Sequence, residues 1–313
     1  MNYYPLGDNA ARQMIDSSTI FEEYRRVAVL ARKFAGGMYW KRQEGYEYLV
    51  KTLPDNRQHR MGGRTPENER VYENFVKDKT GVEGRLRDLK AALADAERLN
   101  KALKVGRVPA LAVSVLQAIE AAGLGEHFTV VGTHALYAYE SAAGVRIVQG
   151  ALATQDVDLL WDARKRVRFL TDIDKLDTSI LKVLQRADRT FMRKEGQNET
   201  AINAKGFEVD FLRRQPEGDD SHPFRFSDDD DDIWPVQARR GSVLTTAPRF
   251  DHAVVSATGR MALMRTIAPR TFIDLKLWLA EKAVDRPEPK RRRDRYQAAI
   301  VQELLEGGLL AAY

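Results

Sequence analysis

Hydrophobic residues recur every three to four positions along several segments of the chain, which is the period of an amphipathic helix. One such segment follows Ser18 and Thr19, where Glu22 and Glu23 complete a capping box. A long charged segment after Pro66 carries only a sparse hydrophobic stripe and is expected to break near Gly81. The pattern predicts helices at residues 18–36, 66–104, 109–122, 177–189, 269–282 and 290–306.

Runs rich in β-branched and aromatic residues lie between these helices and favour strands. A hairpin is expected over residues 38–53, with its turn at Glu44-Gly45. The other runs predict strands at residues 58–63, 127–131, 146–148 and 156–161, a strand or hairpin at 200–213, and two strands within 253–267. No repeat with a period of about 20 to 50 residues is visible, which excludes solenoids and propellers. We therefore expect a mixed α/β (α+β) protein with a mixed sheet.

The length and composition of the predicted segments change near residue 105. Before it the segments are long and charged, whereas from Val108 onward they are short and hydrophobic. A chain of 313 residues is long enough for two domains or for one large elaborated domain. We expect an N-terminal helix–hairpin–long helix module at residues 1–104, a core at 105–245, and C-terminal strands and helices at 246–313.

Composition excludes several classes of protein. Hydrophobic residues make up 43% of the chain and charged residues 30%, which is typical of a folded globular protein. No window approaches about 18 uncharged hydrophobic residues, and residues 1–12 do not resemble a secretion signal. The chain has no cysteine, so disulfide scaffolds, thiolate zinc sites and iron–sulfur clusters are excluded. A cytoplasmic protein without a membrane partner is expected.

The net charge of +5 is unevenly distributed. Residues 1–104 hold 20 basic and 15 acidic side chains, and a second basic segment contains Arg291, Arg292, Arg293 and Arg295. Both regions are compatible with a nucleic acid or an NTP as partner, although solvated helix faces account for such runs more simply. The acidic run Asp228–Asp232 is expected to form a flexible loop, because five like charges repel one another.

Two aspartates in the predicted strand at 156–161 have a spacing that suits metal binding. Asp156 and Asp158 are separated by one residue, so they share one face of the strand about 6.6 Å apart. A third acid, Asp210, lies in another hydrophobic segment. Burial of unpaired carboxylates is costly, and a hard cation with oxygen ligands relieves that cost. Two magnesium ions could bind there and stabilise a phosphoryl transfer.

A turn precedes these acids. Gly132-Thr133 ends the predicted strand at 127–131 and opens a helix, so backbone N–H groups meet there in a place suited to phosphate. An ordinary turn with a threonine N-cap accounts for the same pattern. His134 either contacts a phosphate or packs in the protein, and packing is the more common role for such a histidine.

The order Gly132-Thr133, Asp156-Val157-Asp158, Asp210 resembles the nucleotidyltransferase fold of the DNA polymerase beta superfamily. The closer similarity is to uncharacterised bacterial nucleotidyltransferase-like proteins, and more loosely to abortive-infection nucleotidyltransferase toxins. It also rests on the segments Tyr39-Trp40-Lys41, Gly45-Tyr46-Glu47-Tyr48, Thr154-Gln155, Pro269-Arg270-Thr271-Phe272, Lys276-Leu277-Trp278 and Arg293-Asp294.

The resemblance implies roles for particular residues. Asp156 and Asp158 would be metal ligands, and Asp210 would be a third ligand or a base-like carboxylate near the acceptor hydroxyl. Gly132 and Thr133 would hold the triphosphate, and Lys276 would reach the phosphates across a cleft, whereas an amphipathic helix equally accommodates a lysine that extends to solvent. Two departures are that threonine stands where serine or glycine is usual, and that the interval from Gly132 to Asp156 is long and requires an insertion such as residues 144–150.

The function expected from these observations is a magnesium-dependent nucleotidyltransferase of the EC 2.7.7 type, with two Mg²⁺ ions and Mn²⁺ as an alternative. It would transfer a nucleoside monophosphate from an NTP to an acceptor hydroxyl on a protein, an RNA or a small molecule. The alternative is a non-catalytic protein that binds nucleotide or nucleic acid, or one component of a toxin–antitoxin pair. A nuclease is disfavoured because the Gly132-Thr133 turn would then lack a purpose.

Overall fold

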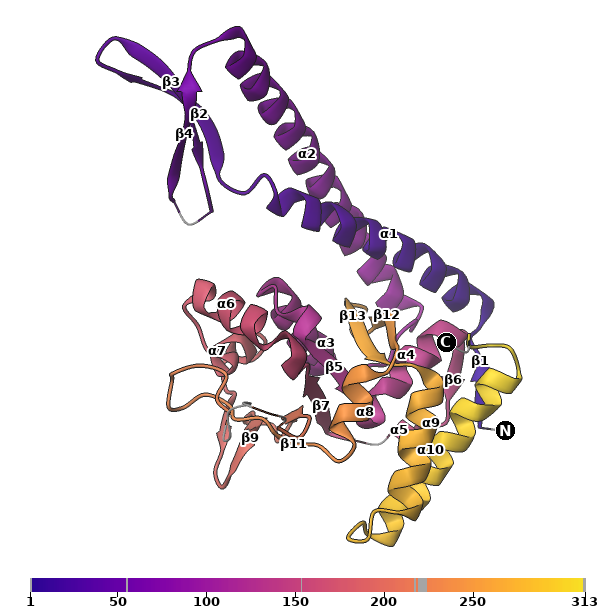
Figure 1. The fold of residues 1–313 in the computed structure, drawn as a ribbon. Helices are drawn as coiled ribbons and strands as arrows, with labels where there is room; N and C mark the ends of the chain where they lie inside the picture. The colour runs from indigo at the N-terminus through magenta and orange to yellow at the C-terminus, as the bar shows by residue number, and fades with distance from the viewer. Residues whose placement is uncertain (1, 55, 153, 217, 219–223, 312–313) are drawn as a thin grey trace. The chain divides into compact units, whose positions relative to one another are not determined.

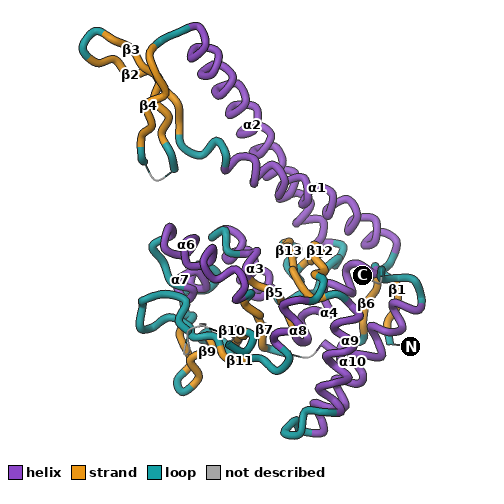
Figure 2. The backbone as a smooth tube through the Cα atoms, in the orientation of Figure 1, coloured by secondary structure: helices purple, strands orange, loops and turns teal. Residues whose placement is uncertain are grey.

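The computed structural model describes residues 2–54, 56–152, 154–216, 218 and 224–311. The chain forms two compact units (Figures 1 and 2). The core unit consists of Met1–Ala11 and Asn100–Tyr313, and the inserted unit consists of Arg12–Leu99. The chain therefore leaves the core unit after a short N-terminal segment and returns to it about 90 residues later.

An eight-stranded mixed sheet forms the centre of the core unit. The strand order is β12-β13-β5-β7-β10-β9-β8, and β11 pairs with β10. β7 and β10 run parallel, whereas β5 pairs antiparallel with β7. The strands are β5 (Phe128–Val131), β7 (Asp156–Trp161), β8 (Met192–Lys194), β9 (Gln197–Ile202), β10 (Glu208–Arg213), β11 (Val236–Gln237), β12 (Arg249–Val255) and β13 (Met261–Ile267). The expected mixed α/β class with a mixed sheet is confirmed.

Helices pack around this sheet and bury its hydrophobic side chains. α3 contacts β13, α4 contacts β12, and α9 pairs with α10. The helices of the core unit are α3 (Ala110–Ala121), α4 (Ala135–Ala143), α5 (Gln149–Leu152), α6 (Arg166–Leu176), α7 (Ile180–Gln185), α8 (Gly241–Thr246), α9 (Pro269–Glu281) and α10 (Glu288–Glu306). Aromatic rings fill one part of the core, where Trp161, Phe211 and Phe226 are fully buried. β12 and β13, from the expected C-terminal part, thus belong to the same sheet as β5.

A two-stranded sheet accounts for the long interval between Gly132 and Asp156. β1 (Tyr3–Pro5) pairs antiparallel with β6 (Val145–Ile147), so the N-terminal segment is attached to the core unit. Glu140 stabilises this region, since its carboxylate accepts the backbone N–H of Ile147 at 2.8 Å and pairs with Arg107. The segment 144–150, expected to be an insertion, contributes β6 and the start of α5.

The inserted unit contains two long helices and a three-stranded antiparallel sheet. Its elements are α1 (Asp8–Arg32), β2 (Gly37–Gln43), β3 (Tyr46–Thr52), β4 (Gln58–Gly63) and α2 (Pro66–Ala102), and both helices continue into the core unit. The strand order is β2-β3-β4, as expected for a hairpin followed by one further strand. An aromatic contact joins the sheet to α2, since the ring centres of Trp40 and Tyr72 lie 6.0 Å apart.

Three predictions about helices were wrong, and one helix was missed. α1 begins at Asp8 rather than near Ser18, and the Thr19 hydroxyl donates to the Ile15 carbonyl at 3.0 Å inside the helix instead of capping its start. α2 continues through Gly81 without a break. The helix expected over residues 177–189 is shorter, since α7 begins after the N-cap Ser179, and a helix that was not predicted, α6, precedes it.

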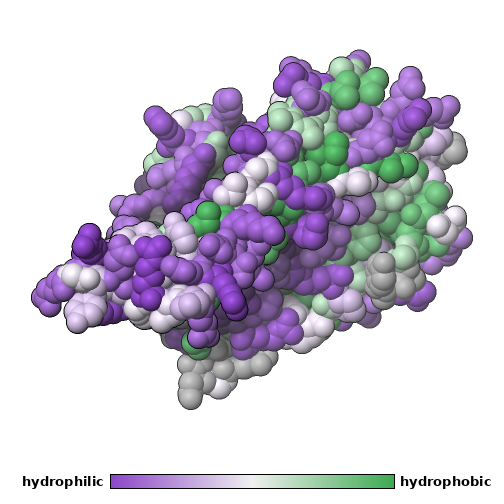
Figure 3. Space-filling model, turned by 90° about the horizontal axis from the view of Figure 1, so that it is seen from above, coloured by the Kyte–Doolittle hydropathy of each residue, from purple (hydrophilic) through white to green (hydrophobic). Residues whose placement is uncertain are grey.

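One face of the molecule is largely polar. Hydrophilic residues dominate the face seen in Figure 3, and hydrophobic residues form separate patches among them. No helix in the described part of the chain is both long enough and hydrophobic enough to span a bilayer.

Candidate active site

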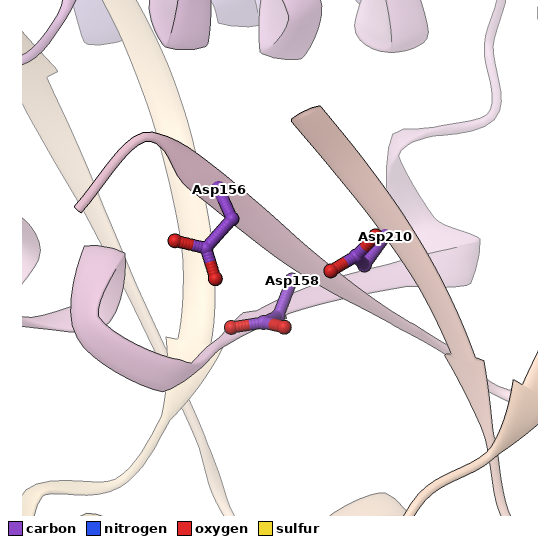
Figure 4. Close-up of side chains that lie close together, drawn as sticks. All are labelled: Asp156, Asp158 and Asp210. Atoms are coloured by element: carbon purple, nitrogen blue, oxygen red, sulfur yellow. The ribbon is translucent and has the colours of Figure 1, made fainter. Parts of the chain in front are cut away.

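Three aspartates converge on adjacent strands of the core sheet. Asp156 and Asp158 lie on one face of β7, because alternate residues of a strand point to the same side. The parallel register pairs Asp210 of β10 with Asp158. Figure 4 shows the three side chains pointing into one common space, and each offers a carboxylate oxygen within 4.8 Å of the other two. The predicted convergence of the three acids is confirmed.

The carboxylates repel one another in the absence of a cation. Burial, followed by the charges of Asp156 and Asp210, raises the pKa of Asp158 to about 7. Burial also raises the pKa of Asp210, although a hydrogen bond from the Thr200 hydroxyl at 2.6 Å opposes that rise. The Thr154 hydroxyl donates to Asp156. Three partly buried carboxylates, two of them with raised pKa values, fit a hard divalent cation, which would remove the repulsion.

The turn after β5 lies against these carboxylates. Val131 pairs with Asp158 across the sheet, so the chain turns beside the acids. Gly132 has a φ of 70°, which favours glycine, and a Cβ at this position would lie 2.1 Å from Oδ2 of Asp158. Only a glycine allows the backbone to approach the carboxylate this closely.

Thr133 and His134 both point into the protein. The Thr133 hydroxyl accepts a hydrogen bond from Gln297 Nε2 at 3.2 Å, so its side chain contacts α10. His134 is buried, and desolvation lowers its pKa to about 4 despite the nearby Asp156. The imidazole is therefore neutral at pH 7, and the packed-histidine interpretation of His134 agrees with this burial.

Lys276 lies on α9 and is buried, so the interpretation as a lysine that extends to solvent was wrong. Its Nζ is 3.0 Å from Oδ1 of Asp294, which also pairs with Arg286. Burial lowers the pKa of Lys276, and Asp294 opposes that shift. The positive charge of Lys276 opposes the rise in the pKa of Asp158, so this group of charges and the acidic site influence one another.

Two polar residues of α10, Asp294 and Gln297, were assigned no role from the sequence. Asp294 holds Lys276, and Gln297 donates to both Thr133 and the Ala151 carbonyl. They lie three residues apart and are fully buried in line with Ile300, Val301 and Leu304. Polar residues that fall within the hydrophobic stripe of a helix were the signal that would have identified them.

Residues of two other charged runs form structural contacts. Asp232, expected in a flexible loop, is instead fully buried, accepting from the backbone N–H of Leu181 at 2.9 Å and from the Ser227 hydroxyl at 2.7 Å. Arg291 donates to the carbonyls of Ala283 and Arg286, which stabilises the connection between α9 and α10.

Comparisons with known proteins agree with this geometry. A family model described as "Nucleotidyltransferase" matches residues 110–311, which is about two thirds of the chain. That range includes the glycine turn, the three aspartates and Lys276. No curated protein and no solved structure matches. The chain belongs to this nucleotidyltransferase family.

Proposed function

We propose that this protein transfers a nucleoside monophosphate from an NTP to a hydroxyl group of an acceptor and releases pyrophosphate, with magnesium as the divalent cation. One observation carries the proposal: three carboxylates with oxygens within 4.8 Å of one another lie beside a turn whose glycine leaves no room for a Cβ next to Asp158. Carboxylates for metal and backbone N–H groups for phosphate are the two elements that such a transfer needs. The family match supports the same reaction class.

The proposed roles follow from the position of each residue. Asp156, Asp158 and Asp210 would hold two Mg²⁺ ions, or Mn²⁺ in their place. When bound, these ions would neutralise charge on the phosphates and orient the reacting oxygens. The turn at Gly132 and Thr133 would bind the triphosphate through backbone N–H groups. Asp210, oriented by Thr200, would serve the side of the site where the acceptor hydroxyl enters.

Lys276 completes the proposed nucleotide site. Its ion pair with Asp294 holds a positive charge close enough to oppose the rise in the pKa of Asp158. To contact a phosphate directly, Nζ would have to exchange Asp294 for the phosphate oxygen. The contributions of these residues are positioning and charge stabilisation, so the reaction needs no covalent intermediate on the protein. NTPs are cytoplasmic metabolites, and we expect the reaction in that compartment.

The alternative is a protein that binds nucleotide or nucleic acid without turnover, or a component of a toxin–antitoxin pair. A complete set of three acids argues against a degenerate site, because loss of catalysis removes the need to keep mutually repelling carboxylates. The acceptor can be a protein, an RNA or a small molecule.

The direct test incubates the full chain with each α-³²P-labelled NTP, magnesium and a cell extract, and asks which molecule becomes labelled. Label is expected in one class of acceptor, and pyrophosphate should appear in equal amount. No label with any NTP, while nucleotide still binds, would support the non-catalytic alternative. Transfer that does not depend on magnesium would overturn the role assigned to the cation.

Single-residue variants test which carboxylates the transfer reaction requires. Asp156→Ala and Asp158→Ala are each expected to reduce transfer by at least roughly a thousandfold, since each removes a ligand and leaves the others repelling one another. Asp210→Asn should keep part of the nucleotide binding and lose most of the transfer rate. The matched control is Asp174→Asn, which changes an exposed aspartate of α6. A variant of Asp156 or Asp158 with wild-type transfer would overturn the assignment.

A further inference from the structure

One face of the three-stranded sheet in the inserted unit carries basic and aromatic side chains together. Residues paired across neighbouring strands share a face, and the register pairs Tyr39 with Val50, Lys41 with Tyr48, and Val50 with Arg60. Tyr46 lies two residues from Tyr48 and therefore belongs to the same face. We call Tyr39, Lys41, Tyr46, Tyr48 and Arg60 the basic–aromatic face.

The opposite face of this sheet packs against α2. On the basic–aromatic face the central positions Tyr48 and Val50 are buried, and the residues around them are exposed. Trp40 and Leu49 point to the opposite side, where Trp40 contacts Tyr72 of α2 and Leu49 is fully buried. On the basic–aromatic face Tyr46 is 76% exposed and Tyr39 is 37% exposed. Lys41 and Arg60 are exposed as well. Exposed aromatic rings next to exposed cations on one face of a sheet indicate a ligand-binding surface.

The charge on this face is of one sign. None of the described strand residues that share the face is acidic, and Glu47, on the other side, pairs with Arg64 at 2.6 Å. Within the described part of the chain, neither Lys41 nor Arg60 forms an ion pair. Arg60 instead lies over the Tyr48 ring, with its guanidinium carbon 3.9 Å from the ring centre. Stacking holds this cation on the face without neutralising it.

We propose that the basic–aromatic face binds single-stranded nucleic acid. Such strands are held by cations that contact the phosphates and by aromatic rings on which exposed bases stack. Lys41 and Arg60 supply the first kind of contact, and the exposed rings of Tyr39 and Tyr46 supply the second. A duplex fits this face poorly, because its bases are already stacked and paired. The proposal concerns a binding site separate from the three aspartates and holds whether or not the protein transfers nucleotides.

The test measures binding of a fluorescein-labelled 12-nucleotide single-stranded RNA by anisotropy, with the full chain and without NTP or divalent cation. Lys41→Glu/Arg60→Glu should weaken binding by at least tenfold. It should also lower the slope of log affinity against log salt by about 1.4, since each phosphate contact on a single strand contributes about 0.7. The matched control, Arg87→Glu/Arg98→Glu, makes the same charge change at exposed positions of α2 and should leave most of the binding.

Variants of Tyr46 distinguish the contribution of base stacking to RNA binding from that of charge. Tyr46→Ala should weaken binding by about 5- to 100-fold, which is the usual effect of losing one stacked base, whereas Tyr46→Phe should retain it. Thermal midpoints of all variants should match the wild type, because these side chains are exposed.

Four outcomes decide the proposal. Equal losses in the α2 control and in Lys41→Glu/Arg60→Glu would mean that net charge alone binds the RNA, and would overturn it. A duplex of the same sequence that binds more tightly than the strand would overturn it too. Tighter binding of an acidic polypeptide such as poly-glutamate than of RNA would assign the face to a protein partner instead. Equal affinity for single-stranded DNA and RNA would support the proposal. It would mean that the face contacts phosphates and bases but not the 2′-hydroxyl group.

Discussion

At the scale of single residues, Gly132 is the position where the turn and the acidic site depend on each other. Its φ is positive, and a Cβ added to it would lie 2.1 Å from Oδ2 of Asp158, so any side chain strains the backbone and displaces a carboxylate. Gly132→Val is expected to weaken NTP binding by roughly tenfold or more, as such backbone strain alone costs about 1–3 kcal/mol. Titration with a fluorescent ATP analogue measures this. Gly150→Val is the control, since a Cβ there meets nothing within 4 Å. Unchanged affinity in Gly132→Val would show that the turn does not bind phosphate.

Asp158 makes stability depend on pH. Its pKa in the folded, metal-free protein is about 7, against 3.8 for an ordinary aspartate. The folded state therefore holds the proton more tightly, so the free energy of unfolding falls as the pH rises from about 4 to 7. Asp158→Asn removes the charge and should stabilise the metal-free protein at pH 8 by on the order of 2 kcal/mol, after allowing for solvent screening.

The measurement is the thermal midpoint of wild type and Asp158→Asn, in chelator, from pH 4 to 8. The difference should shrink as the pH falls below 7 and vanish near pH 4, where the wild-type carboxyl carries its proton in the folded state and largely does so in the unfolded state. In excess magnesium the thermal midpoint of the wild type should rise, because a cation that binds only the folded state stabilises that state. A midpoint difference that does not vary with pH would contradict the raised pKa.

At the scale of secondary-structure elements, α10 holds residues of the site in place through two buried polar side chains. Asp294 pairs with Lys276 of α9, and Gln297 bridges Thr133 and the carbonyl of Ala151. Asp294→Asn would leave the buried charge of Lys276 without its partner, and such a loss typically costs about 3–5 kcal/mol. Urea unfolding should show this loss, whereas Glu306→Gln, an exposed position on the same helix, should change stability by less than about 0.5 kcal/mol. A small effect in Asp294→Asn would contradict this and mean that Asp158 stabilises the charge of Lys276 in its place.

The sequence predicted elements whose patterns are local and missed those set by tertiary contacts. β7 was placed correctly at residues 156–161, because two aspartates that alternate with a hydrophobic residue and precede a hydrophobic run match the period of a strand. The convergence of Asp210 with Asp158 could be predicted because both acids lie in hydrophobic segments, and a buried carboxylate is costly unless it shares a partner or a cation. By contrast, the pairing of β1 with β6 and the burial of Asp232 depend on segments far apart in sequence. No local pattern contains that information.

At the scale of the whole molecule, the inserted unit is separable from the proposed chemistry. All the proposed site residues and the family match at 110–311 lie in the core unit, whereas the basic–aromatic face lies at residues 12–99. The two ends of the inserted unit are close together, since Gln13 Nε2 donates to the Ala96 carbonyl at 3.4 Å. A short linker between Ala11 and Asn100 can therefore replace the unit without pulling on the core, because β1 stays paired with β6.

Replacing residues 12–99 with a Gly-Ser linker of about six residues should give a folded protein that keeps NTP binding and the pH-dependent stability of Asp158. The hydrophobic core of the sheet lies within the core unit, so the thermal midpoint should change little. Binding of single-stranded RNA should fall at least as far as in Lys41→Glu/Arg60→Glu. Nucleotide binding is measured with the fluorescent ATP analogue and RNA binding by anisotropy. Loss of both activities in a folded protein would show that the two units act as one site, whereas RNA binding that persists would place the nucleic-acid surface on the core unit.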